Sequence, residues 1–171
     1  MSMGKPAPLV VHGWTVFAHP LFLAQLEDLA RQVEVLEQKD PAGYAKKNAT
    51  KRLAAIAMLA FDVIPHDPAR PEYRQGGTPG AEHKHWLRAK FFQRYRLFFR
   101  YHAPSKVIVF TWVNDEDTKR ADESRDDAYL VFRKMLGSGH PPSDWERLLA
   151  QARAEAKRLK KAASRVSATQ P

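Results

Sequence analysis

The spacing of the hydrophobic positions changes from helical to strand-like near the middle of the chain. From residue 20 to about residue 61, apolar side chains recur every three or four residues, as on one face of an amphipathic helix. A short apolar strand is expected just before them, at residues 13–18. His19-Pro20 favours the start of a first helix. Asp40-Pro41 favours a restart, with Asp40 as the N-cap and Pro41 in the first turn of a second helix. Two N-terminal helices are therefore expected, packed through their apolar stripes.

Beyond a Pro- and Gly-rich stretch, the apolar positions follow the two-residue period of strands. Two strands are expected near residues 85–91 and 94–102, joined by a tight connection at Phe92-Gln93. A third, at residues 106–114, is almost entirely apolar and is expected to be buried on both faces. A helix near residues 127–136 follows, and then a last helix capped by Ser143. This order predicts one α+β domain with two N-terminal helices, an antiparallel sheet and C-terminal helices.

The two middle strands separate two kinds of side chain. Successive strand residues point to opposite sides of a sheet. One side of the second strand carries Tyr95, Leu97, Phe99 and Tyr101, and the other carries Arg94, Arg96, Phe98 and Arg100. Arg88 and Lys90 share one side of the first strand and would face Arg94 or Arg96 in a hairpin. Like charges that face each other repel unless an anion binds, so this face suits a polyanion, with RNA as the first candidate.

Charge reinforces this interpretation. The chain has 171 residues, a formal net charge of +9 and a pI of about 9.9, which favours a nucleic acid or an acidic partner. Residues 83–114 contain seven Lys or Arg and no Asp or Glu, whereas residues 115–127 contain seven acids and three bases. An alternative is that one or two of the cations pair with these acids. Residues 153–165 hold six bases and one acid, so the segment from 150 onward is expected to be a solvated extension or else a helix lying on RNA or the ribosome.

Several classes of chemistry are excluded or disfavoured. The absence of cysteine removes disulfides, thiolate catalysis and cysteine-based zinc sites. His83 and His85 could face the same way as a metal pair, but no third ligand is evident, so neither a metal site nor a cofactor is expected. His102 shares a strand face with Arg100 and could act as an acid or a base. The sequence shows no signal-peptide core and no membrane span, so a cytoplasmic location is expected.

RNA cleavage needs only groups that this cationic face can supply in part. RNA carries its own nucleophile, the 2′-hydroxyl, and cleavage requires a base, a cation near the scissile phosphate and an acid near the leaving oxygen. A metal is optional. Guanidinium groups stabilise phosphoryl charge well because they donate hydrogen bonds in a planar fork and remain protonated.

Many short runs between residues 12 and 147 resemble, in order, the YhaV family of type II toxins, which belongs to the RelE-like superfamily of bacterial mRNA interferases. Among them are His12-Gly13-Trp14, Ala18-His19-Pro20, Arg94-Tyr95-Arg96-Leu97-Phe98-Phe99-Arg100-Tyr101, Asp127-Ala128-Tyr129, Gly139-His140-Pro141-Pro142 and Asp144-Trp145-Glu146. The resemblance implies a RelE-like fold and a metal-independent endoribonuclease that cleaves mRNA on translating ribosomes. It also implies an AbrB-like antitoxin of the PrlF type, in a complex that binds its own operator DNA. The expected division is a flexible N-terminus at 1–11, a toxin domain at 12–149 and a basic extension at 150–171.

The resemblance also implies roles for individual residues. Tyr95-Arg96-Leu97 is similar to the run whose arginine serves the scissile phosphate, so Arg96 and Arg94 are expected at the phosphate. The remaining expected catalytic residues are Arg88 and Lys90, near positions of strand lysines in the superfamily, and Arg120, after the last strand. The expected substrate-binding residues are Lys84, Arg100, His102 and Asn114.

A second hypothesis is a non-catalytic nucleic-acid-binding regulatory subunit that acts with an acidic partner. It predicts RNA binding without cleavage products.

Overall fold

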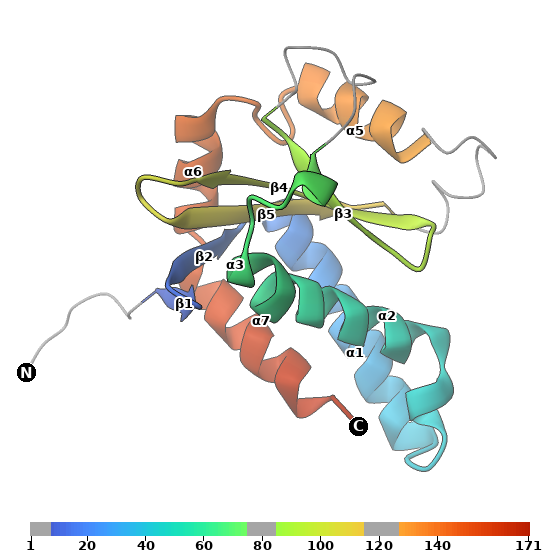
Figure 1. Cartoon of the computed structure of the whole chain (residues 1–171). Coiled ribbons are helices and arrows are strands. Elements are labelled where there is room, and N and C mark those ends of the chain that lie inside the picture. Colours follow the sequence, from blue (N-terminus) through green and yellow to red (C-terminus); the bar gives the residue numbers. More distant parts are fainter. Residues whose placement is uncertain (1–7, 75–84, 115–126) are drawn as a thin grey trace, which may run out of the picture.

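A five-stranded sheet organises the chain, with helices on both of its faces (Figure 1). The computed structural model describes residues 8–74, 85–114 and 127–171. The strands are β1 (Leu9–Val11), β2 (Trp14–Ala18), β3 (Leu87–Phe91), β4 (Tyr95–His102) and β5 (Val107–Val113). Their order across the sheet is β1-β2-β5-β4-β3, and only the β2–β5 pair is parallel. The α+β class and the three middle strands predicted from the sequence are confirmed.

One face of the sheet packs against the first two long helices and the last one. These are α1 (Pro20–Lys39), α2 (Asn48–Met58) and α7 (Ala156–Ala168); a π-helical turn (Leu59–Val63) and the short α3 (Ile64–His66) continue α2. Two 3₁₀ turns, Tyr44–Lys46 and Pro71–Tyr73, complete this part. The first core lies here and includes Phe22, Leu26, Leu53, Leu97, Phe99 and Phe110. Within the described parts of the chain, no helix is both long and apolar enough to cross a membrane.

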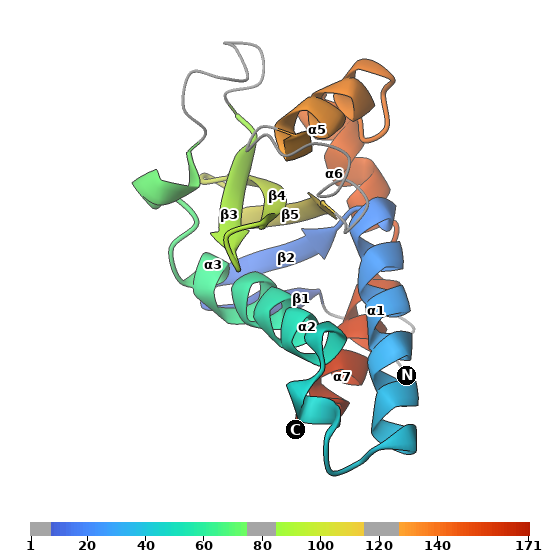
Figure 2. The same cartoon turned by 90° about the vertical axis from the view of Figure 1, so that its right-hand side faces the viewer.

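A second core covers the opposite face, where α5 (Asp127–Gly137) and α6 (Trp145–Arg153) pack (Figure 2). Phe98 lies at its centre, fully buried, with its ring stacked 4.3 Å from Phe132 and 5.8 Å from Trp112 between centroids. The alternation along β4 is thus confirmed, since Leu97 and Phe99 enter the first core. The face that carries the arginines, however, is largely covered by helices, so its cations can reach solvent only around the rim of this core.

His19, at the start of α1, connects the helices that cover the two faces of the sheet. Its Nδ1 accepts a hydrogen bond from the Leu21 N–H at 3.2 Å and thereby caps the helix. Its Nε2 lies 2.6 Å from Oε1 of Gln151 on α6. Burial lowers the pKa of His19, which favours the neutral ring that the cap requires.

The structure differs from the sequence-based expectations at the starts of two helices. Asp40 ends α1 instead of starting a second helix, and its carboxylate accepts a hydrogen bond from the Gly43 N–H at 3.0 Å. The second helix begins only at Asn48. The N-cap of α6 is Asp144, not Ser143, because its carboxylate accepts from the Arg147 N–H at 3.0 Å. In addition, β1 lies within the N-terminal segment that was expected to be flexible.

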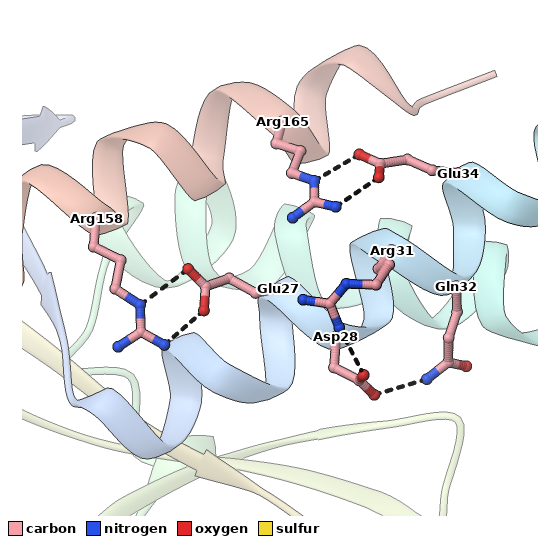
Figure 3. A network of polar contacts seen from close by, with 7 residues as sticks. All are labelled: Glu27, Asp28, Arg31, Gln32, Glu34, Arg158 and Arg165. Atoms are coloured by element: carbon pink, nitrogen blue, oxygen red, sulfur yellow. Dashed lines mark hydrogen bonds and ion pairs between the residues drawn. The ribbon is translucent and has the colours of Figure 1, made fainter.

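The C-terminal segment is helical and packs on the rest of the fold, which does not agree with a solvated extension, whereas a helix that lies on RNA or the ribosome stays a prediction. Leu159, Ala162 and Val166 of α7 are buried in the first core. Two bidentate ion pairs fasten α7 to α1, with shortest N–O distances of 2.6 Å in each: Arg158 with Glu27, and Arg165 with Glu34 (Figure 3). The arginine hydrogen bonds hold the pKa values of both glutamates below their usual range. Two of the basic residues in this segment are therefore part of the fold.

Candidate active site

The β3–β4 hairpin brings cations of two strands together. Lys90 pairs with Arg96 in the antiparallel register, and Arg88 pairs with Phe98. The expected meeting of cations across the hairpin is confirmed for Lys90 and Arg96, whereas Arg88 faces an aromatic ring. Because cross-strand partners project to the same side of a sheet, Lys90 and Arg96 can act on one ligand.

Tyr129 on α5 lies between two of these arginines. The Nε–H of Arg88 donates a hydrogen bond to the Tyr129 hydroxyl, and the Nη1 of Arg88 donates to the Glu72 carbonyl at 2.7 Å. The guanidinium carbon of Arg96 lies 5.8 Å from the centroid of the Tyr129 ring. We call Arg88, Arg96 and Tyr129 the Arg–Tyr cluster. It combines two permanent cations with a phenol that can donate a proton.

Hydrogen bonds hold the backbone around Arg96 in place, and the residue is only 7% exposed to solvent. Its N–H donates to Oδ1 of Asn114 at 2.7 Å, and Nδ2 of Asn114 donates to the Arg94 carbonyl at 2.9 Å. The side chain of Arg96 donates through Nη1 to the Gln93 carbonyl at 3.3 Å, while its Nε has no partner among the described residues. Asn114 therefore sets the start of β4, and Arg96 keeps hydrogen-bonding capacity beside Tyr129.

Two further predicted residues lie beside the turn of the hairpin. Lys90 and Arg94 are both exposed, and no carboxylate of the described residues pairs with either of them. They are consequently available to a polyanion in solvent. The predicted residues Lys84 and Arg120 lie outside the described residues, as does the expected pairing of cations with the acidic segment.

Arg100 and His102 form a separate group farther along β4. The guanidinium carbon of Arg100 lies 5.5 Å from the Trp86 ring centroid and 5.4 Å from that of Trp145, and its Nη1 donates to the Ser143 carbonyl at 2.6 Å. Burial lowers the pKa of Arg100. His102 contacts Ser105 at 2.7 Å and is six residues beyond Arg96, which corresponds to about 20 Å along a strand. The structure does not bring these two residues into the Arg–Tyr cluster.

Tyr129 is the residue that sequence reasoning missed as a member of the site. Its helix buries Ala128, Phe132 and Leu136 at intervals of four residues, and Tyr129 sits beside this stripe. A tyrosine at the edge of an apolar helical stripe is expected to lie at the border of a hydrophobic core. Nothing in the sequence, however, places Tyr129 against Arg88, 41 positions earlier.

The site as a whole is built for anions. It combines guanidinium, ammonium and phenol groups, and no cluster of three or more potential metal ligands occurs in the described parts of the chain. A phosphate or a phosphodiester is the ligand that such a set of donors fits.

Comparisons with known proteins agree with this chemistry. Residues 16–153 match the Toxin_YhaV family, described as "Toxin with endonuclease activity, of toxin-antitoxin system". The chain is 46% identical over 143 residues to "Ribonuclease toxin YhaV" of Escherichia coli (strain K12), a match that covers 82% of this chain and 93% of that protein. It is equally similar to "Toxin YhaV" of Escherichia coli O157:H7, with the same coverage. No solved structure gives a significant match.

The matched segment contains most of β2, all of β3, β4, β5, α5 and α6, and so includes every residue of the Arg–Tyr cluster. The resemblance seen in the sequence is thus confirmed, and the chain belongs to the YhaV family of toxins, which have endonuclease activity and act in toxin–antitoxin systems.

Proposed function

We propose that this toxin is an endoribonuclease that cleaves mRNA by means of the Arg–Tyr cluster. The observation that supports the proposal most directly is the position of Tyr129 between the guanidinium groups of Arg88 and Arg96. The name of its relative in Escherichia coli, a ribonuclease toxin, points to the same substrate class.

In the proposed reaction the 2′-hydroxyl of one nucleotide gives up its proton to solvent water, and its oxygen forms a bond to the adjacent phosphorus. The bond from phosphorus to the 5′-oxygen of the next nucleotide breaks, which leaves a 2′,3′-cyclic phosphate and a 5′-hydroxyl. Negative charge accumulates on the phosphoryl oxygens, and Arg96 stabilises it through a preorganised guanidinium. Lys90 and Arg94 hold the flanking phosphates.

Tyr129 acts as the general acid in this proposal. Its oxygen accepts the hydrogen bond from Arg88, so its own proton is free to be donated outward. The second contact of Arg88, to the Glu72 carbonyl, fixes the guanidinium and hence the phenol. The departing 5′-oxygen takes the proton of Tyr129 as the bond to phosphorus breaks.

The test is to incubate the purified protein with RNA in the presence and absence of EDTA. Cleavage products are expected in both samples at rates within about twofold, because guanidinium groups supply the positive charge at the phosphate. Loss of cleavage in EDTA with recovery on adding Mg²⁺ would contradict a metal-independent reaction. RNA binding without any cut product would favour the regulatory-subunit hypothesis.

Replacing Tyr129 by phenylalanine is expected to slow cleavage by about 10²–10⁴-fold, the usual contribution of a general acid. The ring contacts with Phe98 and Arg96 are kept, so the melting temperature should stay close to that of the parent. Single-turnover cleavage at saturating RNA measures the effect. Leu130→Ala, an exposed neighbour on α5, serves as the matched control. If Tyr129→Phe cleaved RNA as fast as the parent, Tyr129 would not be the general acid.

We also propose a cellular location, a site of action and an antitoxin for this protein. We place the protein in the cytoplasm, acting on mRNA at the ribosome, neutralised by a PrlF-type AbrB-like antitoxin and repressing its operon together with that antitoxin. The net charge of +9 supports an acidic partner. An adjacent reading frame that encodes a small AbrB-like protein would support it further.

A further inference from the structure

The turn between β3 and β4 has a backbone that its sequence does not favour. Phe92 and Gln93 both lie in the left-handed region, with φ of 49° and 63°. Positions in this region favour Gly, Asn and Asp, since larger side chains are crowded there. The β1–β2 turn of the same chain, His12-Gly13, does have a glycine in its second left-handed position, at φ 84°. The β3–β4 turn has none.

The side chain at the tip is a large aromatic ring held in solvent. Phe92 is 54% exposed and touches Phe91 edge-on, with 5.6 Å between ring centroids. Phe91 is buried, so it provides a fixed support under the exposed ring. An exposed phenylalanine in a strained turn contributes little to the core, and strain of this kind is concentrated at functional positions.

Cations flank this residue closely in the sequence. Lys90 precedes Phe92 by two residues and Arg94 follows it by two; both are exposed, and the strand register places Arg96 opposite Lys90. Residues 85–114 contain no acidic side chain. An aromatic face flanked by phosphate-binding cations is the arrangement with which proteins hold single-stranded nucleic acid, the base stacked on the ring and the backbone along the cations.

We propose that Phe92 is a stacking platform for a nucleobase of the RNA substrate, next to the nucleotides held at the Arg–Tyr cluster. The inference rests on the proposed ribonuclease function and adds the contact that positions the strand. The ring is 54% exposed at the turn, so an unpaired base can lie on it. Stacking needs no base-edge hydrogen bonds, so Phe92 contributes affinity and register while tolerating different bases.

The experiment measures binding of an oligoribonucleotide with 2′-O-methyl groups, whose blocked nucleophile prevents cleavage. Phe92→Ala is expected to weaken this binding by about 5- to 150-fold, the range found for loss of one stacked base. Phe92→Tyr keeps an aromatic face and should bind within about twofold of the parent. Met58→Ala, which changes an equally exposed apolar residue on α2, is the matched control and should bind like the parent. Single-turnover cleavage of saturating unmodified RNA by Met58→Ala should likewise stay within about twofold of the parent.

The double variant Phe92→Asn with Gln93→Gly separates a functional role from a structural one. It supplies the residues that the turn prefers, so its melting temperature should rise by about 2–4 °C. Its RNA binding should nevertheless weaken as much as that of Phe92→Ala. Higher stability combined with lower affinity is a result that a purely structural tip would not give.

Two outcomes would overturn the inference. Parent-like RNA binding by Phe92→Ala, or an equal loss of binding in Met58→Ala, would contradict the stacking contact. Cleavage by the parent protein would in that case still support the proposed function. A parent protein that binds the methylated RNA but never cuts unmodified RNA would refute the proposed function instead. Crosslinking with an oligonucleotide that contains 5-iodouracil should, in addition, attach the base to Phe92.

Discussion

Replacing Arg96 by alanine is expected to lower RNA cleavage by about 10²–10³-fold, as does the loss of one preorganised donor to a developing oxyanion. The guanidinium is almost buried beside the Tyr129 ring, and its Nε has no partner among the described residues. Charge placed in such an environment is screened weakly by water, so it acts strongly on a phosphate nearby. The measurement is the single-turnover rate with RNA in excess of its dissociation constant.

Two controls make this result interpretable. Arg31→Ala removes an arginine from the solvent side of α1, where it pairs with Asp28, and should leave cleavage unchanged. Arg96→Lys keeps the charge but loses the planar fork, so it should recover only part of the rate. Far-UV circular dichroism should confirm that Arg96→Ala remains folded. If that folded variant cleaved RNA and arrested growth as the parent does, the assignment of Arg96 would be wrong.

A stop codon in place of codon 156, which removes α7, is expected to destabilise the protein by about 3–6 kcal/mol. Leu159 and Val166 are buried in the first core, and full burial of such side chains contributes about 1.5–3 kcal/mol each. The loss is comparable with the whole stability of a typical domain, about 5–15 kcal/mol. Urea unfolding followed by circular dichroism measures it, and much of the truncated protein is expected to be unfolded at 37 °C.

Substitutions on the outer side of α7 provide the comparison. Lys157→Ala and Lys161→Ala change exposed residues of the same helix and should alter the free energy of unfolding by less than about 0.5 kcal/mol. A truncated protein that unfolds at the same urea concentration as the full chain would show that α7 is dispensable for the fold.

The features of the fold that could be predicted from the sequence are those set by residues close to one another in the chain. The alternation of Tyr95, Leu97 and Phe99 is a local property of one strand, and it correctly identified the side facing the first core. The same alternation placed Phe98 among the arginines, which was itself a sign that this side is covered. Asp40 was misassigned because an aspartate is suited equally to a helix N-cap and to the turn in which it bonds Gly43.

The remaining features depend on contacts between distant parts of the chain. The basic C-terminal segment has the charge pattern of a solvated tail, and only Glu27 and Glu34, 131 positions earlier, show that two of its arginines are paired. The proposed roles of Arg88 and Arg96 rested on their strand positions and on the family resemblance. Tyr129 belongs to the site only because α5 packs beside the hairpin, a contact that the sequence does not reveal.

The parallel pairing of β2 with β5 has a consequence for the synthesis of this toxin. Thr15 pairs with Val107, so the centre of the sheet cannot close until more than half of the chain has left the ribosome. The hairpin with Lys90 and Arg96 can form earlier from local contacts, but it then lacks both its neighbouring strand and the helix that carries Tyr129. Contacts of such long sequence separation also slow folding. A nascent chain should therefore lack the complete Arg–Tyr cluster until translation is nearly finished.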